Sequence, residues 1–201
     1  MTTPDETEAD LVALVGSRMA HDLANPLGAI ANGLELLELT GLGGSPEFDL
    51  IAASVDNANR KIKWFRLAFG AAAPGQTVSG AEIADLIAPV DGRRLAIDWA
   101  AGADLPRAEV KKILLGLMCA ESAAPFGGSA RVIADGTGWR IEVIAERLAA
   151  DPGLWAVFSG AAPAEGLAAG QVHFALLARE AARTGRPVSA EFAAGAMLMR
   201  L

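Results

Sequence analysis

Residues 8–39 read EADLVALVGSRMAHDLANPLGAIANGLELLEL, and this stretch decides the N-terminal part of the fold. Its apolar residues recur at steps of three and four, which is the period of one stripe on an α-helix. The members of this stripe are Val12, Val15, Met19, Leu23, Leu27, Ile30, Leu34 and Leu37. Pro26 lies inside the pattern and removes one helical hydrogen bond, so we expect a single long helix with a bend just upstream of it.

A second helix is predicted from about residue 46 to residue 70. Ser45 is a good N-cap, and Pro46 suits the first turn. A heptad-like seam follows, made of Ile51, Val55, Ala58, Ile62, Phe65 and Phe69. Two helices joined by a short loop form an antiparallel hairpin. A hairpin alone buries little more than one stripe, so we expect two copies to form a four-helix bundle as a homodimer. The alternative is that the second half of the same chain covers the stripe.

The stretch 71–80, AAAPGQTVSG, has no periodicity and reads as a linker between domains at 1–72 and 80–201. Beyond it, helices are predicted at 81–88, 106–124, 151–158 and 167–184. Strands are predicted at 94–100, 129–134, 139–145, 188–192 and 196–201. Turn sequences at 135–138 (DGTG) and 193–195 (AAG) close two hairpins. The pattern predicts an α+β fold, a sandwich of helices on a mostly antiparallel sheet.

Composition excludes several classes of protein. The chain has 201 residues, 52% of them hydrophobic, which excludes wholesale disorder. Its formal charge of −7, with no run of Lys or Arg, argues against binding nucleic acid or an anionic membrane. The N-terminus does not resemble a signal peptide, and no apolar run is long enough to span a membrane. Cys119 is the single cysteine, which fits a reducing cytoplasm. With only two histidines, His21 and His173, a His-rich metal site is excluded.

The most informative side chain is His21. At about 100° per residue, it lies about 200° around the helix from both Met19 and Leu23. His21 is therefore expected to point away from the apolar stripe, into water. An exposed, uncharged imidazole has a ring nitrogen whose lone pair is free to attack an electrophile. The alternative is an ordinary solvated surface histidine.

The neighbours of His21 suit such a nucleophile. Asp22 could hold the N–H of the other ring nitrogen, although adjacent side chains diverge on a helix. Asn25 shares the face of His21 and could hydrogen-bond a phosphoryl oxygen. Ser17 and Arg18 precede His21 by four and three residues, and Arg18 could attract an acidic partner site. We therefore expect catalytic residues at His21, Asp22 and Asn25, and partner-binding residues at Ser17 and Arg18.

Residues 21–27, HDLANPL, resemble the phosphoacceptor box of sensor histidine kinases, which lies on the first helix of a dimeric hairpin. The second half resembles the kinase ATP-binding domain in the order of its elements, but the nucleotide-binding residues are absent. The two asparagine positions of the kinase correspond approximately to Gly116 and Ala120, which cannot ligate a cation. Segment 145–151, AERLAAD, has no glycine, and only Gly166 and Gly170 remain of a glycine-rich loop.

A phosphoacceptor hairpin joined to a kinase-like domain without ATP residues resembles the histidine phosphotransferases of alphaproteobacteria. The resemblance implies a dimeric, cytoplasmic protein that relays phosphoryl groups through His21, assisted by Asp22 and Asn25. It implies a hybrid kinase's receiver domain as donor and CtrA-like and CpdR-like response regulators as acceptors. No cofactor or metal is expected on this chain, because Mg²⁺ belongs to the receiver domain. The alternatives are a divergent ATP-binding sensor histidine kinase and a non-catalytic adaptor that docks receiver domains.

Other polar residues are expected to be structural. His173 and Cys119 lie on predicted core helices, and the stretch 109–112 (EVKK) is predicted to be a solvated face. Four cations of the second helix lie off its apolar seam and are predicted to face solvent: Arg60, Lys61, Lys63 and Arg66. Whether they also meet an acidic receiver surface is left open by the sequence.

Overall fold

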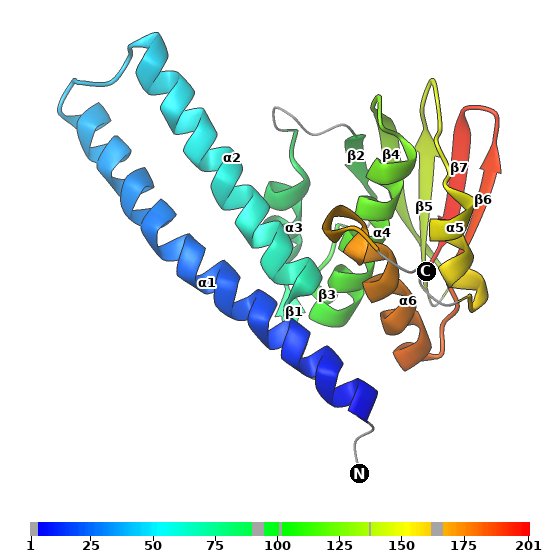
Figure 1. Ribbon diagram of the computed structural model, residues 1–201. Coiled ribbons are helices and arrows are strands. Elements are labelled where there is room, and N and C mark those ends of the chain that lie inside the picture. The colour runs from blue at the N-terminus through cyan, green and yellow to red at the C-terminus, as the bar shows by residue number, and fades with distance from the viewer. Residues whose placement is uncertain (1–3, 90–94, 101, 137, 162–166) are drawn as a thin grey trace. The chain divides into compact units, whose positions relative to one another are not determined.

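The computed structural model of the chain describes residues 4–89, 95–100, 102–136, 138–161 and 167–201 (Figure 1). The chain divides into two compact units, Met1–Ala72 and Ala73–Leu201. The first unit is a helical hairpin, and the second is a sheet with helices packed on it.

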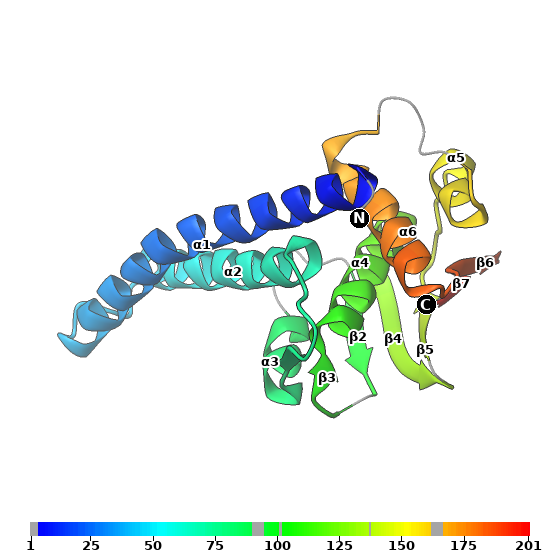
Figure 2. The same ribbon diagram turned by 90° about the horizontal axis from the view of Figure 1, so that it is seen from below.

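The hairpin consists of α1 (Pro4–Leu39) and α2 (Pro46–Phe69), which lie side by side in antiparallel directions (Figures 1 and 2). Both predicted helices are confirmed, and α1 continues through Pro26. The Ser45 side chain accepts a hydrogen bond from the Phe48 N–H at 3.1 Å. This N-cap satisfies a backbone donor that the first turn of α2 would otherwise leave unpaired.

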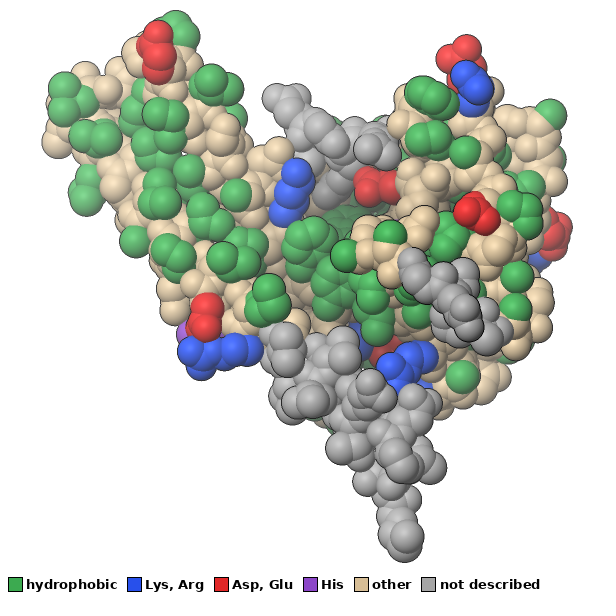
Figure 3. Space-filling model, in the orientation of Figure 1, with side chains coloured by type: hydrophobic (Ala, Val, Ile, Leu, Met, Phe, Trp, Pro, Cys, Tyr) green, Lys and Arg blue, Asp and Glu red, His purple; other side chains and the backbone are tan. Residues whose placement is uncertain are grey.

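The apolar stripe of α1 divides into two rows. One row contains the half-buried Leu27 and Leu34, and the buried Ala20, which is outside the predicted stripe, lies in line with them at a spacing of seven residues. The other row is 43–60% exposed and consists of Met19, Leu23, Ile30 and Leu37. On α2, Ile51 and Phe65 are also exposed, although the seam predicted them to pack. Apolar side chains consequently run along the surface of the hairpin (Figure 3).

The second unit contains a five-stranded sheet in the order β2-β4-β5-β7-β6. The strands are β2 (Leu95–Trp99), β4 (Gly128–Asp135), β5 (Gly138–Ile144), β6 (Ser189–Ala193) and β7 (Ala196–Arg200). β2 pairs with β4 in parallel, and the other neighbours pair antiparallel, so the predicted α+β fold is confirmed. Both hairpins form; Gly195 has φ +72°, which a residue with a side chain rarely adopts.

The helices of this unit are α3 (Gly80–Ile87), α4 (Arg107–Ala123), α5 (Pro152–Trp155) and α6 (Val172–Thr184). Short 3₁₀ turns, η1 (Ala156–Ser159) and η2 (Ala169–Gln171), follow α5 and precede α6. The sequence missed β1 (Thr77–Val78) and β3 (Leu105–Pro106), which pair antiparallel. Two residues are too few to show a strand period.

At Gly116, the backbone of α4 lies close to the sheet. A Cβ atom there would lie 2.9 Å from Ile141 Cδ1 and 3.3 Å from Met199 Sδ, side chains of β5 and β7. Gly116 and Ala120 are both buried, and glycine lets the helix backbone approach the sheet. The position that the kinase resemblance assigned to a metal ligand therefore has a packing role.

The prediction of a solvated face at 109–112 is wrong. Lys111 and Lys112 are buried, and Glu109 accepts a hydrogen bond from Trp139 Nε1 at 3.0 Å. Lys111 Nζ forms an ion pair with Glu180 Oε1 of α6 at 2.8 Å. Because α4 lies between the sheet and α6, even its polar side is covered, and the Lys111 charge needs this partner.

Candidate functional site

His21 lies on α1 with its side chain 68% exposed, so the predicted exposure is confirmed. Its Nδ1 lies 3.2 Å from Oδ1 of Asp22. A carboxylate can only accept, so the proton of a neutral ring lies on Nδ1. The lone pair is then on Nε2, which is the nucleophilic nitrogen of this arrangement.

Asp22 is held from both sides. Arg18 Nε donates a hydrogen bond to the second carboxylate oxygen, Oδ2, at 2.7 Å. The pKa of Asp22 lies below its ordinary value, first because of the hydrogen bond with His21 and next because of the one with Arg18. Adjacent helical side chains were expected to diverge, but here Asp22 joins Arg18 and His21 in one network. The carboxylate is therefore charged and directed at the imidazole at neutral pH.

A cavity of about 350 Å³ adjoins His21 within the hairpin. From α1 it is lined by His21 and Asn25, which the sequence placed on one face, with Ala20 and Ala24 beside them. From α2 it is lined by Asn59, Ile62, Lys63 and Arg66. Sequence reasoning did not connect these α2 residues with His21. The side chain of Ser17 lies outside the described part of the structure, so its predicted role stays a prediction.

A second cavity, of about 580 Å³, is bordered by the segments that the kinase resemblance assigned to nucleotide binding. Ser122 lines it from α4, rather than Gly116 or Ala120, which are buried. Of the residues found lining it, only Asp151 is charged, and Asp151 Oδ1 accepts a hydrogen bond from the Gly153 N–H at 2.9 Å. The cavity thus offers a carboxylate, and no described cation, to a phosphate group.

The two remaining candidates are structural, as predicted. His173 is 3% exposed, and its Nε2 lies 3.1 Å from Ser122 Oγ. Burial lowers the pKa of His173 to about 4, so the ring is neutral at physiological pH. Cys119 is buried, and desolvation raises the pKa of its thiol well above the ordinary value. Neither group is a reactive nucleophile.

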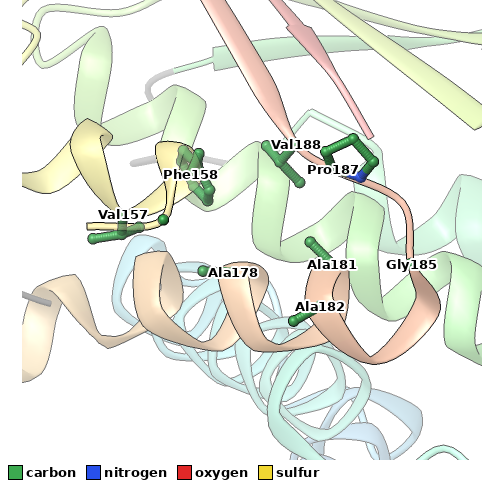
Figure 4. Close-up of a pocket in the computed structure, with 9 residues that line it drawn as sticks. Val157, Phe158, Ala178, Ala181, Ala182, Gly185, Pro187 and Val188 are labelled. Carbon is green, nitrogen blue, oxygen red and sulfur yellow. The ribbon is translucent and has the colours of Figure 1, made fainter. Parts of the chain in front are cut away.

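A third cavity, of about 340 Å³, lies between η1, α6 and the segment before β6 (Figure 4). Val157, Phe158, Ala178 and Val188 are among its lining residues, and none of the lining residues is titratable. Its walls can hold apolar groups but offer no acid, base or nucleophile for chemistry.

The described residues contain neither a metal-binding cluster nor a membrane-spanning helix. No group of three or more His, Cys, Asp or Glu side chains there is placed to hold a metal ion. Among the helices of this part of the chain, none combines the length and the apolar character needed to cross a membrane.

Comparison with known proteins gives consistent matches. Residues 80–195 match the family model described as histidine phosphotransferase C-terminal domain. Protein phosphotransferase ChpT of Brucella abortus (strain 2308) is 37% identical over 184 residues, covering 86% of this chain and 87% of that protein. A solved structure of a bacterial phosphotransferase is 29% identical and superposes with a TM-score of 0.66, covering 100% of this chain and 97% of that chain.

Proposed function

Because the chain belongs to the histidine phosphotransferase family and so acts in a phosphorelay, we propose that His21 is its phosphoacceptor. The observation that carries this proposal is the exposed imidazole whose Nδ1 is held by Asp22 at 3.2 Å. The buried His173, with its pKa lowered to about 4, offers no comparable access to a partner protein.

The proposed reaction is an in-line transfer from an aspartyl phosphate of a receiver domain. Nε2 of His21 attacks phosphorus, the N–P bond forms, and the acyl P–O bond breaks. The electron pair of that bond leaves with the receiver's carboxylate. The ring keeps its proton on Nδ1 and becomes cationic, and the Asp22 carboxylate stabilises this cation. No proton is released, so the reverse transfer to a second receiver uses the same groups.

Asn25 and Arg18 have supporting roles in the proposal. Asn25 lines the cavity beside His21, where its amide N–H groups can donate to a phosphoryl oxygen. Arg18 positions Asp22 through the 2.7 Å hydrogen bond. Its side chain is 76% exposed, and we propose that it, with Ser17, also meets an acidic surface of the partner.

A receiver domain is the proposed phosphoryl donor, in preference to ATP. The cavity of the second unit supports this choice, since Asp151 would repel phosphate groups and no described cation lines it. Mg²⁺ is proposed to belong to the receiver, as is usual for aspartyl phosphate chemistry. The specific partners that we propose are the receiver domain of a hybrid kinase as donor, and CtrA-like and CpdR-like response regulators as acceptors. A cytoplasmic location completes the proposal, in line with the buried free thiol of Cys119.

Homodimerisation is also part of the proposal. The exposed row Met19, Leu23, Ile30 and Leu37 is apolar over most of the described length of α1. His21 lies about 200° from both Met19 and Leu23, so a partner hairpin covering the row would leave the imidazole accessible.

Dimerisation is tested by variants of this row. Leu23→Glu combined with Ile30→Glu is expected to give monomers in light scattering. Ala29→Glu, at an exposed position off the row, should leave the dimer intact. A folded monomeric wild type at micromolar concentration would contradict dimerisation.

The phosphoacceptor is tested by incubating the full chain with each phosphorylated receiver domain of its source organism. The expected result is an acid-labile label that mass spectrometry locates on His21 and that is absent from His21→Gln. ATP alone should give no label. Label on another residue would overturn the proposal. Autophosphorylation with ATP would favour a divergent kinase, and receiver binding without any label would favour a docking adaptor.

A further inference from the structure

The cavity beside His21 is unusual in the polarity of its α2 wall. Asn59, Lys63 and Arg66 are spaced by four and three residues, so they share one face of α2. On a helix of a hairpin, the face toward the partner helix is ordinarily apolar. Here an amide and two cations of α2, both cations solvent-exposed, line the cavity beside the candidate nucleophile.

The charges around a phosphorylated His21 are unbalanced without further cations. The phosphoryl group adds about two negative charges, and Asp22 contributes a third. The imidazolium offsets one of them, and Arg18, which is hydrogen-bonded to Asp22, offsets another. One negative charge remains, concentrated on the phosphoryl oxygens. Cations that border the cavity can offset that charge, and the side chains of Lys63 and Arg66 are the ones present.

We propose that Lys63 and Arg66 bind the phosphoryl group when it is transferred to and from His21. The inference rests on the proposed role of His21 and adds two residues of α2 to the reacting site. As the N–P bond forms, negative charge remains on the transferring oxygens, and donors that border the same cavity as the ring can stabilise it. Arg66 can engage two phosphoryl oxygens at once, whereas Lys63 acts as a point charge.

The test uses phosphoramidate, a small N–P donor, because docking of a receiver then has no influence. Loading of His21 is followed by ³¹P NMR on the full chain, with circular dichroism to check folding. The double variant Lys63→Met, Arg66→Met is expected to load about tenfold more slowly or worse, and each single variant several-fold more slowly. Lys61→Met is the matched control, since Lys61 is exposed on α2 but does not line the cavity. The conservative single variant Lys63→Arg keeps the positive charge and should load His21 at close to the wild-type rate.

The outcomes separate this inference from the proposed function. If receivers label His21 of the wild type, but the double variant loads as fast as Lys61→Met, the inference is wrong and the relay role of His21 stands. If no receiver labels the wild type, while phosphoramidate loading still depends on the two cations, the relay role fails instead. A double variant that unfolds is replaced by Lys63→Gln and Arg66→Gln tested singly, with the same comparison to Lys61→Met.

Discussion

The two histidines of the chain lie on helices of different units and have opposite environments. His21, on the hairpin, is 68% exposed and hydrogen-bonded to a carboxylate. His173, on α6, is 3% exposed and lies 3.1 Å from a neutral hydroxyl, that of Ser122. Burial lowers the pKa of His173 to about 4, because a charged ring there would lose its hydration. The same side chain is thus exposed beside a carboxylate in one unit and buried by packing in the other.

This difference extends to the other polar groups of each unit. In the second unit, the buried Lys111 is paired with Glu180 of the same unit. In the hairpin, the polar groups Asn25, Asn59, Lys63 and Arg66 line a cavity together with the exposed His21. Chemistry is therefore expected from the hairpin, and stability from the packed unit. The predictions below test this contrast.

The largest expected effect concerns His173 and stability. Its pKa of about 4 in the folded chain is below the ordinary value of 6.5, so between these pH values only the unfolded chain binds the proton. The neutral, buried ring contributes fully to the free energy of unfolding above pH 6.5, the pKa of the ring in the unfolded chain. This contribution is lost as the pH falls toward about 4, the pKa of His173 in the folded chain. The loss amounts to about 3 kcal/mol at 1.36 kcal/mol per pKa unit.

Urea unfolding at about pH 7 and about pH 4.5 measures this loss. In His173→Gln, which cannot titrate there, the pH dependence should be flatter by most of that amount. Equal pH dependence in the variant and the wild type would mean that the ring is not buried as a neutral group.

A smaller effect is expected when Asp22 is replaced. Asp22→Asn removes the charge that stabilises the imidazolium, and its amide N–H group can face Nδ1 and favour the other tautomer, so transfer should slow by about 30-fold. The initial rate of labelling from a phosphorylated receiver measures the change. Glu35→Gln, an exposed carboxylate elsewhere on α1, should keep the wild-type rate. An unaffected Asp22→Asn rate would show that the charge of this carboxylate does not assist the transfer.

The smallest effect is expected at Arg18. Its ion pair with Asp22 is solvent-exposed, and exposed pairs contribute little. Arg18→Met should therefore slow phosphoramidate loading by only about threefold. If Arg18 also meets a receiver, transfer from the receiver should weaken further and more so at low salt. Loss of loading as complete as in His21→Gln would mean that Arg18 has a direct catalytic role.

Much of the fold was predictable because its local signals are strong. Helix periodicity, the Ser45–Pro46 start and the glycine turn at Gly195 each specify a backbone conformation without tertiary information. The prediction of a solvated face at 109–112 was wrong because α6 covers this side of α4. Such packing depends on tertiary structure, which the local sequence pattern does not show. The two-residue strands β1 and β3 have no periodicity for a sequence to show.

Of the candidate site, the sequence predicted the α1 side but not the α2 side. The box at 21–27 indicated His21, Asp22 and Asn25, but the α2 side of the cavity was missed. A register argument could have found it: α1 ends at Leu39 and α2 begins at Pro46, so opposed residue numbers sum to about 85 (39 + 46). Residue 21 then lies opposite residue 64, which places Lys63 and Arg66 nearby. The link between Arg18 and Asp22 depends on rotamers, which sequence spacing does not fix.

The central claim is tested most directly by following one phosphoryl group through the protein. The full chain is loaded from a ³²P-labelled receiver, separated from it and mixed with a second, unlabelled receiver. We expect acid-labile label on His21 that then leaves for the second receiver, with His173→Gln passing it on and His21→Gln passing none. Label reaching the second receiver at the same rate through His21→Gln would contradict the account.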